Sequence, residues 1–372
     1  MRALFIVAGI FLLTVTSSAQ DNILDSPGTQ KTVEKCLYAT YGFDFENAAI
    51  LQQQLQEELP QHPAPYFLKA LIIYWQQFPL LPGSPWTNDF EMYMDLSIEF
   101  AGLMLEKDPV SMEGVFFDMH ARAFKAMFWA DNGKPARVIA DIDNMYRSTM
   151  QGIEYKEQFS DFYFSSGLYN YYIVAYVEKH PAYKPIAMLF RKGDKEKGLR
   201  ELQIAVNTST YIRYEAMLFM SLLQLNYEKN ITGAIDYAAQ LYNLFPKNIY
   251  YHGQYLIILC HNRNYVVASA INDKLKTSNE PFHRMIHSMT EGFLDENYRN
   301  APSTATKKYN QVISLAEEFG PFADLYAAIA WAGLARIAEK SGNLNDARKY
   351  RRKSSRLSVY DFILDFSFED SR

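Results

Sequence analysis

The stretches NITGAIDYAAQLYNLFP (residues 230–246) and NYVVASAINDKL (residues 264–275) are two versions of one helical pattern, and they decide the fold. Each opens on an asparagine, and Ala234 and Ala268 hold the same place in the pattern, 34 residues apart. Small residues at that place let two helices approach closely, while large apolar residues such as Leu241 fill the gaps and Pro246 ends the helix. Because a single hairpin cannot bury its own apolar face, the pattern predicts hairpins that stack on one another.

Further copies of the pattern lie on both sides of this stretch. They include Phe45, Ala48, Leu55 and Pro60 near the N-terminus, then Tyr66, Ala70 and Ile73, and Trp331, Leu334, Ala335, Ala338, Gly342, Leu344 and Ala347 near the C-terminus. Their spacing resembles the tetratricopeptide repeat family. The resemblance covers most of residues 30–357, is good over 211–276 and 322–357, and is poor over 79–192, where the loop PLLPGSPW (79–86) interrupts one pair. Residues 162–202 also look like exported tetratricopeptide proteins of Gram-negative bacteria, with a fainter similarity to a eukaryotic tetratricopeptide family linked to inclusion-body clearance.

This resemblance implies an all-α fold, a right-handed superhelical solenoid of roughly eight tetratricopeptide-like hairpins. We expect a short segment at 20–30, irregular repeats over 31–192, more regular repeats over 193–357 and a capping segment or tail at 358–372. In the family, the first helix of each hairpin lines a concave groove that holds a partner. The matching positions give a candidate groove made of Phe219, Asn226, Tyr250, Arg336 and Glu339. This groove lacks the Lys/Arg set with which some relatives clamp a C-terminal carboxylate.

The first nineteen residues are typical of a secretory signal peptide. Arg2 is followed by an apolar run from Ala3 to Val15, and Ser17 and Ala19 are small residues placed for cleavage before Gln20. The run is shorter than the roughly 20 residues that span a bilayer. The alternatives are an N-terminal anchor or a buried first helix. We expect export to the periplasm or secretion, no transmembrane segment in the mature chain, and a bacterial source.

Composition excludes several classes of function. There are 37 Lys plus Arg against 42 Asp plus Glu, a net charge of −5, so an overall footprint for nucleic acid is absent. Two cysteines, Cys36 and Cys260, exclude a disulfide framework and predict buried thiols. Phosphate-binding loops and serine-nucleophile motifs are lacking. His283, His287 and Glu291 share a helix face, but we do not assign a metal there, because Arg284 stands where a metalloprotease needs its glutamate.

Three features leave structural and functional interpretations open. The basic residues of 348–356 either form a solvated helix face or dock to an anionic surface at the cell envelope. The tail YDFILDFSF (360–368) either caps the last repeat or docks elsewhere. The aromatic cluster between Phe162 and Tyr176, like Trp86, packs in a core or binds a ligand.

The function that follows is an exported, non-enzymatic scaffold without a cofactor, which binds a protein or peptide in its groove. The alternative is a glycan-binding helical-repeat protein of the cell envelope, motivated by Trp86 and the tyrosine cluster. An enzyme built around His283, His287 and Glu291 is the third and weakest hypothesis.

Overall fold

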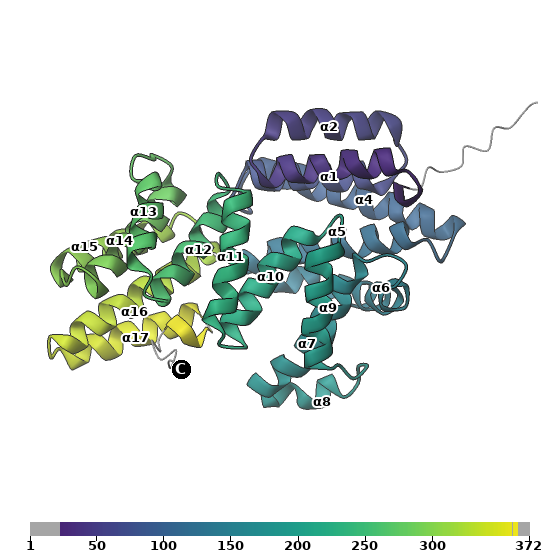
Figure 1. Ribbon diagram of the computed structural model, residues 1–372. Coiled ribbons are helices and arrows are strands. Elements are labelled where there is room, and N and C mark those ends of the chain that lie inside the picture. Colours follow the sequence, from purple (N-terminus) through teal and green to yellow (C-terminus); the bar gives the residue numbers. More distant parts are fainter. Residues whose placement is uncertain (1–22, 359, 364–372) are drawn as a thin grey trace, which may run out of the picture.

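The computed structural model describes residues 23–358 and 360–363, and within them all regular structure is helical (Figure 1). Consecutive long helices pair into eight hairpins over this part of the chain. The pairs are α1 (Pro27–Tyr41) with α2 (Phe45–Glu58), α3 (Pro63–Gln76) with α4 (Trp86–Lys107), α5 (Met112–Asp131) with α6 (Ile142–Tyr155), α7 (Phe162–Lys179) with α9 (Lys195–Thr208), α10 (Arg213–Asn226) with α11 (Ile231–Leu244), α12 (Ile249–His261) with α13 (Tyr265–Asn272), α14 (Pro281–Asn297) with α15 (Pro302–Ala316), and α16 (Asp324–Lys340) with α17 (Leu344–Leu357). The predicted all-α solenoid of about eight helical hairpins is confirmed.

Short helical turns connect or flank these hairpins. They are η1 (Ile23–Asp25), η2 (Pro135–Asp141), η3 (Pro181–Tyr183), α8 (Lys184–Ala187), η4 (Asp273–Leu275), η5 (Gly320–Ala323) and η6 (Asp361–Ile363). The predicted signal peptide, residues 1–19, lies outside the described residues. Within the described ranges, none of the helices combines the length and the apolar character that crossing a bilayer requires.

The residue that opens the repeated pattern is a helix N-cap. The Asn230 side chain accepts a hydrogen bond from the Gly233 amide at 3.0 Å, and Asp194 accepts one from the Lys197 amide at 2.9 Å. Such a cap satisfies one of the free N–H groups of the first turn, and its removal costs about 1 kcal/mol. Asn343 caps α17 in the same way, through the Asp346 amide. At these three second helices the asparagine or aspartate therefore sets the first residue, whereas Asn264, at the N-cap of α13 (Tyr265–Asn272), makes no cap hydrogen bond through its side chain.

Small buried residues bring the two helices of a hairpin together, as the pattern predicts. Ala48, Ala234 and Ala268 are all fully buried. At two of them the first helix also donates a hydrogen bond to the alanine carbonyl, from Cys36 Sγ at 3.4 Å and from Ser221 Oγ at 2.9 Å. The closeness of the two helices thus follows directly from the missing side-chain volume.

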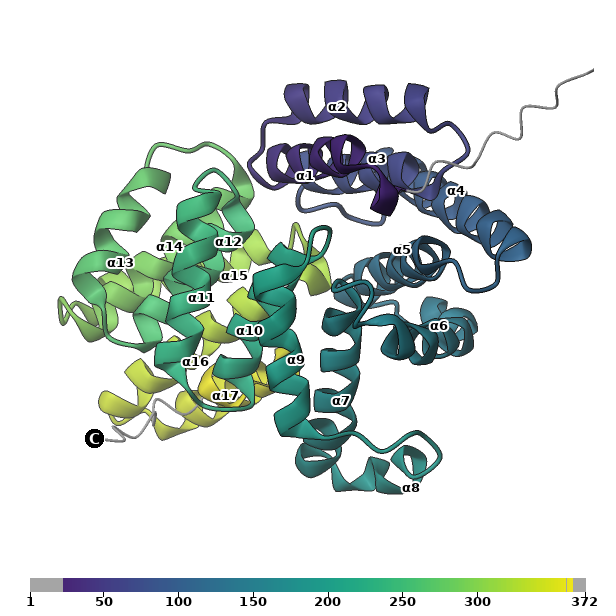
Figure 2. The ribbon, with the colours of Figure 1, turned by 45° about the vertical axis from the view of Figure 1, so that its right-hand side comes forward.

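The two ends of the solenoid fold back against each other through an inner aromatic junction. We use this name for Tyr41, Trp75, Phe78, Tyr214, Phe245, Tyr250, Tyr251, Phe282 and Phe322. The Phe78 ring, from the loop after α3, lies 5.6 Å from Phe282 and 5.4 Å from Phe322, measured between centroids. Asn248, which precedes α12, donates to the Tyr41 carbonyl of α1 at 3.1 Å, so the first hairpin lies beside the middle of the chain (Figure 2). Side chains of the protein itself occupy much of the inner face.

A buried carboxyl group lies next to this junction. Glu215, on the first turn of α10, is buried, and its Oε2 atom has no hydrogen-bond partner among the described residues. Burial raises the pKa of Glu215 to about 8, well above its usual value. Burial raises the pKa of Tyr251, and the negative charge of ionised Glu215 raises it further. The carboxyl is therefore largely protonated at neutral pH.

The end of the described chain turns back into the molecule. Phe362 and Ile363 are buried, the Phe362 ring lies 4.9 Å from the His261 ring of α12, and η6 contacts α10 and α16. The helix before it, α17, buries only Ala347 and Ser354. This segment therefore covers the interior side of the C-terminal hairpins, while residues 364–372 lie outside the described part of the chain.

Candidate binding pocket

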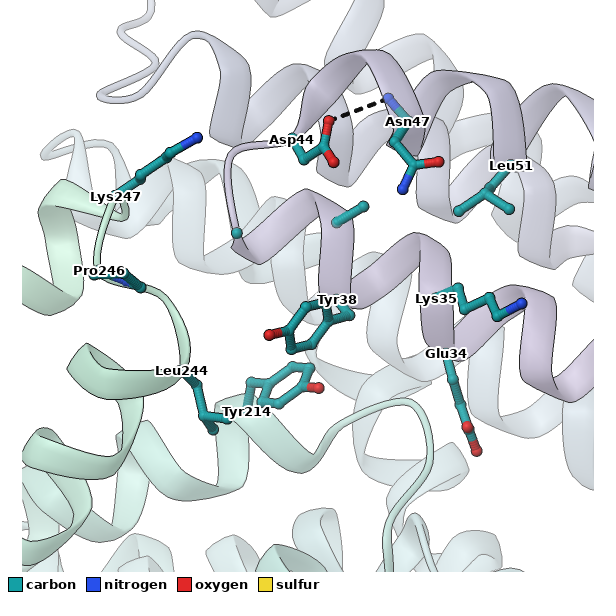
Figure 3. A pocket seen from close by; sticks show the side chains of 12 residues that line it. Glu34, Lys35, Tyr38, Asp44, Asn47, Leu51, Tyr214, Leu244, Pro246 and Lys247 are labelled. Carbon is teal, nitrogen blue, oxygen red and sulfur yellow. Dashed lines mark hydrogen bonds between the residues drawn. The ribbon is translucent and has the colours of Figure 1, made fainter.

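A hollow of about 750 Å³ separates the first hairpin from the middle of the solenoid. One wall comes from α1 and the start of α2, and the other from α10 and the segment that joins α11 to α12 (Figure 3). We call it the Tyr38 pocket; its lining is Glu34, Lys35, Tyr38, Ala39, Gly42, Asp44, Asn47, Leu51, Tyr214, Leu244, Pro246 and Lys247. Its volume falls in the range of small-ligand and side-chain-binding clefts, roughly 300–1,000 Å³.

Two tyrosines from distant parts of the chain line this pocket. The rings of Tyr38 and Tyr214 project toward one another across the gap in Figure 3. Tyr38 is 50 % exposed, although its ring centroid lies 5.2 Å from that of Phe245. Tyr214 is held from behind, edge-on to Phe245 at 4.7 Å and to Tyr41 at 5.2 Å. The inner aromatic junction therefore fixes the back of the pocket and leaves one tyrosine face open.

The rim of the pocket carries charges of both signs. Glu34 and Lys35 extend from α1, and Asp44 accepts a hydrogen bond from the Asn47 amide at 3.4 Å as the N-cap of α2 (Figure 3). Lys247 stands on the opposite wall. All four charged side chains are exposed, and the lining contains no His, Cys, Ser or Thr. An aromatic and aliphatic floor inside a mixed polar rim is suited to binding.

Tyr250, one of the predicted groove residues, lies in a second and smaller hollow of about 380 Å³. Tyr326, Gln254, Asp131 and Tyr360 also line it, so it joins α5, α12, α16 and the returning C-terminal segment. Burial raises the pKa of Asp131 to about 6 and raises the pKa of Tyr250 as well. Tyr326 Oη is buried without a hydrogen-bond partner among the described residues. This hollow therefore brings predicted groove residue Tyr250 together with a buried hydroxyl that has no partner among the described residues.

The other predicted groove residues are spread over several environments. Phe219 packs edge-on against Phe164 at 5.5 Å, and Asn226 is half-buried with Oδ1 unpaired within the described chain. Arg336 donates two hydrogen bonds to buried Glu296, at 2.7 and 2.9 Å. Glu339 is exposed and pairs with Arg351 of α17. The structure thus does not gather the five residues in one pocket, and their role in binding stays a prediction.

His283, His287 and Glu291 lie on α14 as the helical spacing predicts, each with a different neighbour. His283 Nδ1 lies 2.9 Å from Ser278 Oγ, and His287 Nδ1 lies 3.3 Å from the Asn272 carbonyl. Glu291 accepts from Asn272 at 3.0 Å and from Arg299 at 2.8 Å. Among the residues that the structure describes, no group of three or more His, Cys, Asp or Glu is arranged to hold a metal ion.

The features left open by the sequence take definite positions. Phe162, Phe164 and Tyr171 of the aromatic cluster are buried, whereas Trp86 is largely exposed at the start of α4. On α17, Lys353 lies over the Trp331 ring at 3.9 Å, while Arg348, Lys349, Arg352 and Arg356 are exposed. Both cysteines are buried free thiols, and burial raises the pKa of Cys36 to about 12.

The sequence did not point to the Tyr38 pocket, because its two walls, residues 34–51 and 214–247, are more than 160 residues apart in the chain. The only local signal is on α1, where Glu34, Lys35 and Tyr38 are exposed between buried Val33, Cys36 and Leu37. Such a surface stripe at helical spacing is common, and it becomes a pocket wall only when α10 packs opposite.

Comparisons with known proteins leave the family open. No family model matches the chain, and no curated protein matches it. One matching solved structure is described as "Human IFIT1 dimer with PPP-AAAA", with 14 % identity, a TM-score of 0.39, and coverage of 86 % of this chain and 69 % of that chain. At this TM-score the likeness supports no statement about ligand or mechanism. The fold described above rests on the helices of the protein itself, and membership of the tetratricopeptide family stays a prediction.

Proposed function

We propose that this protein is a non-enzymatic helical-repeat scaffold that holds a short segment of a partner protein in the Tyr38 pocket. The observation that carries the proposal is the half-exposed Tyr38 ring, which faces Tyr214 from a distant helix and lies on a rigid aromatic backing. Tyrosines in such settings offer large contact area at low entropic cost and are frequent hot spots of protein interfaces. Leu51 and Leu244 extend the apolar floor on either side.

The partner segment that fits best has an apolar or aromatic anchor flanked by charged residues. The anchor would lie between Tyr38 and Tyr214, and the flanking charges would meet Lys35 and Glu34 on one wall and Lys247 on the other. Charges of both signs at the rim select the orientation of the segment more than they add to its affinity. Of the predicted groove residues Phe219, Asn226, Tyr250, Arg336 and Glu339, Tyr250 lines the hollow of about 380 Å³, which is a second candidate site for the same partner.

We place this scaffold in an exported compartment, at the periplasmic side of the envelope or outside the cell. The motivation is residues 1–20 alone, with their single Arg2, apolar run and small residues before Gln20. N-terminal sequencing of the protein recovered from its native cells tests this directly. A chain that begins at Gln20 supports export, and a chain that keeps Met1 contradicts it.

A photo-crosslinking amino acid at position 38 tests the pocket. We expect this substitution to capture a discrete partner segment in native cells, while the same substitution at Tyr298, which is 54 % exposed on another face, captures none of it. A synthetic peptide of the captured segment should then lose at least about tenfold in affinity for Tyr38→Ala and for Tyr214→Ala. Equal capture at positions 38 and 298, or unchanged affinity of both variants, would contradict the assignment.

Glycan binding is the second candidate function, and one observation favours it. The open Tyr38 face lies near Asn47 and Asp44, and an aromatic ring beside amide and carboxylate groups is also suited to a sugar. An array of envelope and secreted glycans distinguishes the two functions. Binding that Tyr38→Ala abolishes would support the glycan hypothesis, and no signal at high protein concentration would remove it.

A further inference from the structure

The segment that connects α7 to α9 stands away from the body of the protein. We call residues 181–192 the α8 projection; it contains η3 and α8, which pack mainly against each other and against α7. In both ribbon views it is the lowest part of the molecule, beyond the end of α7 (Figures 1 and 2). It has a defined conformation, because Tyr169 donates a hydrogen bond to the Arg191 carbonyl at 2.6 Å and the Phe190 ring lies 5.1 Å from the Tyr146 ring.

The α8 projection exposes several large apolar side chains. Leu189 is 84 % exposed and Met188 is 78 % exposed, the two highest values among the large hydrophobic residues that the structure describes. Ile186 and Tyr183, their neighbours, are about half exposed. Contiguous apolar surface of this kind marks a site of interaction with a protein or a membrane, whereas single exposed apolar residues are ordinary.

The charged residues around this apolar surface indicate a membrane rather than a protein as its partner. Residues 179–193 contain four basic residues, Lys179, Lys184, Arg191 and Lys192, and no acidic residue, in a chain whose net charge is −5. Lys184 and Lys192 are exposed, Arg191 pairs with Glu154, and the acidic residues Glu178 and Asp194 flank the segment on its two sides. Apolar side chains at a tip, surrounded by lysines, are the pattern of an interfacial membrane anchor, where the lysines meet anionic headgroups.

An apolar hollow lies directly behind the exposed residues. It measures about 630 Å³ and lies between α7 and the projection. Ile173, Val177, Met188 and Phe190 line it, and its charged lining residues are Lys184, Lys192 and Glu178. Such a hollow accepts aliphatic groups, and the lysines at its edge are placed to meet a negative charge attached to them. Apolar tip, basic edge and apolar hollow together match the chemistry of an acidic phospholipid layer.

We propose that the α8 projection docks this protein onto a bilayer surface rich in anionic phospholipid, with Met188 and Leu189 inserted between the headgroups. This site is separate from the Tyr38 pocket and does not depend on the function proposed for it. It also differs from the basic face of α17, where Arg348 and Arg352 are exposed without a comparable apolar tip.

Vesicle sedimentation tests the proposal. The purified protein should bind vesicles of equal parts phosphatidylglycerol and phosphatidylcholine, bind pure phosphatidylcholine weakly, and release as salt is added. Met188→Glu with Leu189→Glu should lower binding about a hundredfold or more. Lys184→Gln with Lys192→Gln should lower it about fivefold per lysine. Ile50→Glu, an exposed apolar residue on α2, is the matched control and should change nothing.

Several results would overturn the proposal. They are absence of vesicle binding at low salt, equal binding to pure phosphatidylcholine, undiminished binding by the Met188→Glu, Leu189→Glu variant, or loss of binding only in Arg348→Gln with Arg352→Gln. If the wild type instead dimerises and the double glutamate variant is monomeric, with no vesicle binding by either, a second copy of the chain occupies the projection.

A fluorescent label removes the dependence on variants of the tip. The two native cysteines are buried, so an environment-sensitive dye would attach selectively to Ala182→Cys on η3. We expect its emission to shift to the blue on anionic vesicles and to stay unchanged on a label at Ile50→Cys. An unchanged spectrum at position 182 would contradict insertion.

Discussion

The inner aromatic junction and the α8 projection are both rich in large apolar residues, and both lie where the repeat pattern is interrupted or must close on itself. At the junction Trp75 is buried and Phe78, from the loop after α3, contacts Phe282 and Phe322 across the molecule. On the projection Met188 and Leu189 face solvent. Interrupted repeats therefore either return apolar side chains to the inner face or expose them for a partner.

The physical difference lies in what stands opposite each segment. The loop after α3 faces the C-terminal hairpins, which the curvature of the solenoid brings back to it. The α8 projection extends from the end of α7 away from that curvature (Figure 2). Its C-terminal end contacts α6, through Phe190 against Tyr146 and Arg191 with Glu154, whereas Met188 and Leu189 stay exposed. Exposed apolar area is unfavourable in water by about 25 cal/mol per Å², so a segment that keeps it gains from a partner that covers it.

Substitution of Trp75 gives the largest expected contrast between the two regions. Trp75→Ala removes a buried ring from the junction and should lower the free energy of unfolding by about 3–5 kcal/mol. Leu189→Ala on the projection should change it by less than about 0.5 kcal/mol. Urea denaturation followed by far-UV circular dichroism measures both. Equal losses for the two variants would mean that the projection is packed in solution.

Two of the predicted groove residues allow a buried ion pair to be compared with an exposed one in the C-terminal hairpins. Arg336→Ala leaves buried Glu296 without its main ionic partner and should cost about 3 kcal/mol, since a buried charge loses its counter-ion. Glu339→Ala breaks an exposed pair with Arg351 and should cost less than about 1 kcal/mol. Thermal unfolding of both variants distinguishes them. If Arg336→Ala kept full stability and lost only partner binding, the groove interpretation of Arg336 would be correct.

The sequence predicted the hairpins well, because their determinants are local. Ala234 and Ala268 lie at the helix contacts, and Asn230 caps its helix, as the spacing indicates. It did not predict the junction or the Tyr38 pocket, because both depend on how curvature accumulates over the eight described hairpins. Tyr38 and Tyr214 meet only after that accumulation. The sequence did not predict the exposure of Met188 and Leu189 either, since an apolar run has the same composition whether or not other residues cover it.

Acidity should affect the junction and leave the projection unchanged. The folded-state pKa of Glu215, about 8, lies above its ordinary value of 4.5, so the folded protein keeps a proton that the unfolded chain has lost between these pH values. Measured as the difference between the wild type and Glu215→Gln, stability should therefore fall as pH rises through this window, by up to about 1.4 kcal/mol per pH unit, and level off above pH 8. The difference is the quantity to measure, because burial lowers the pKa of His120, His252 and His261 to about 4, and these groups shift the stability of both proteins in the opposite direction below pH 6.5. Glu215→Gln should flatten the profile, while Glu34→Gln, an exposed control, should not. A wild-type minus Glu215→Gln difference that stays constant between pH 4.5 and 8 would contradict the protonated state.

The last comparison has the smallest expected effect on stability. It uses the reactivity of the native cysteines to report on the junction. Cys36 lies in the first hairpin and Cys260 lies in α12; both are buried, and burial raises both thiol pKa values, so neither should react with a thiol reagent in the folded state. Ala182→Cys on the projection should change stability by less than about 0.5 kcal/mol and react at once. In urea, Cys36 and Cys260 should become reactive together with global unfolding. If Cys36 reacted in the native protein while Cys260 did not, the first hairpin would separate from the solenoid on its own, and the Tyr38 pocket would be an opening between two moving parts.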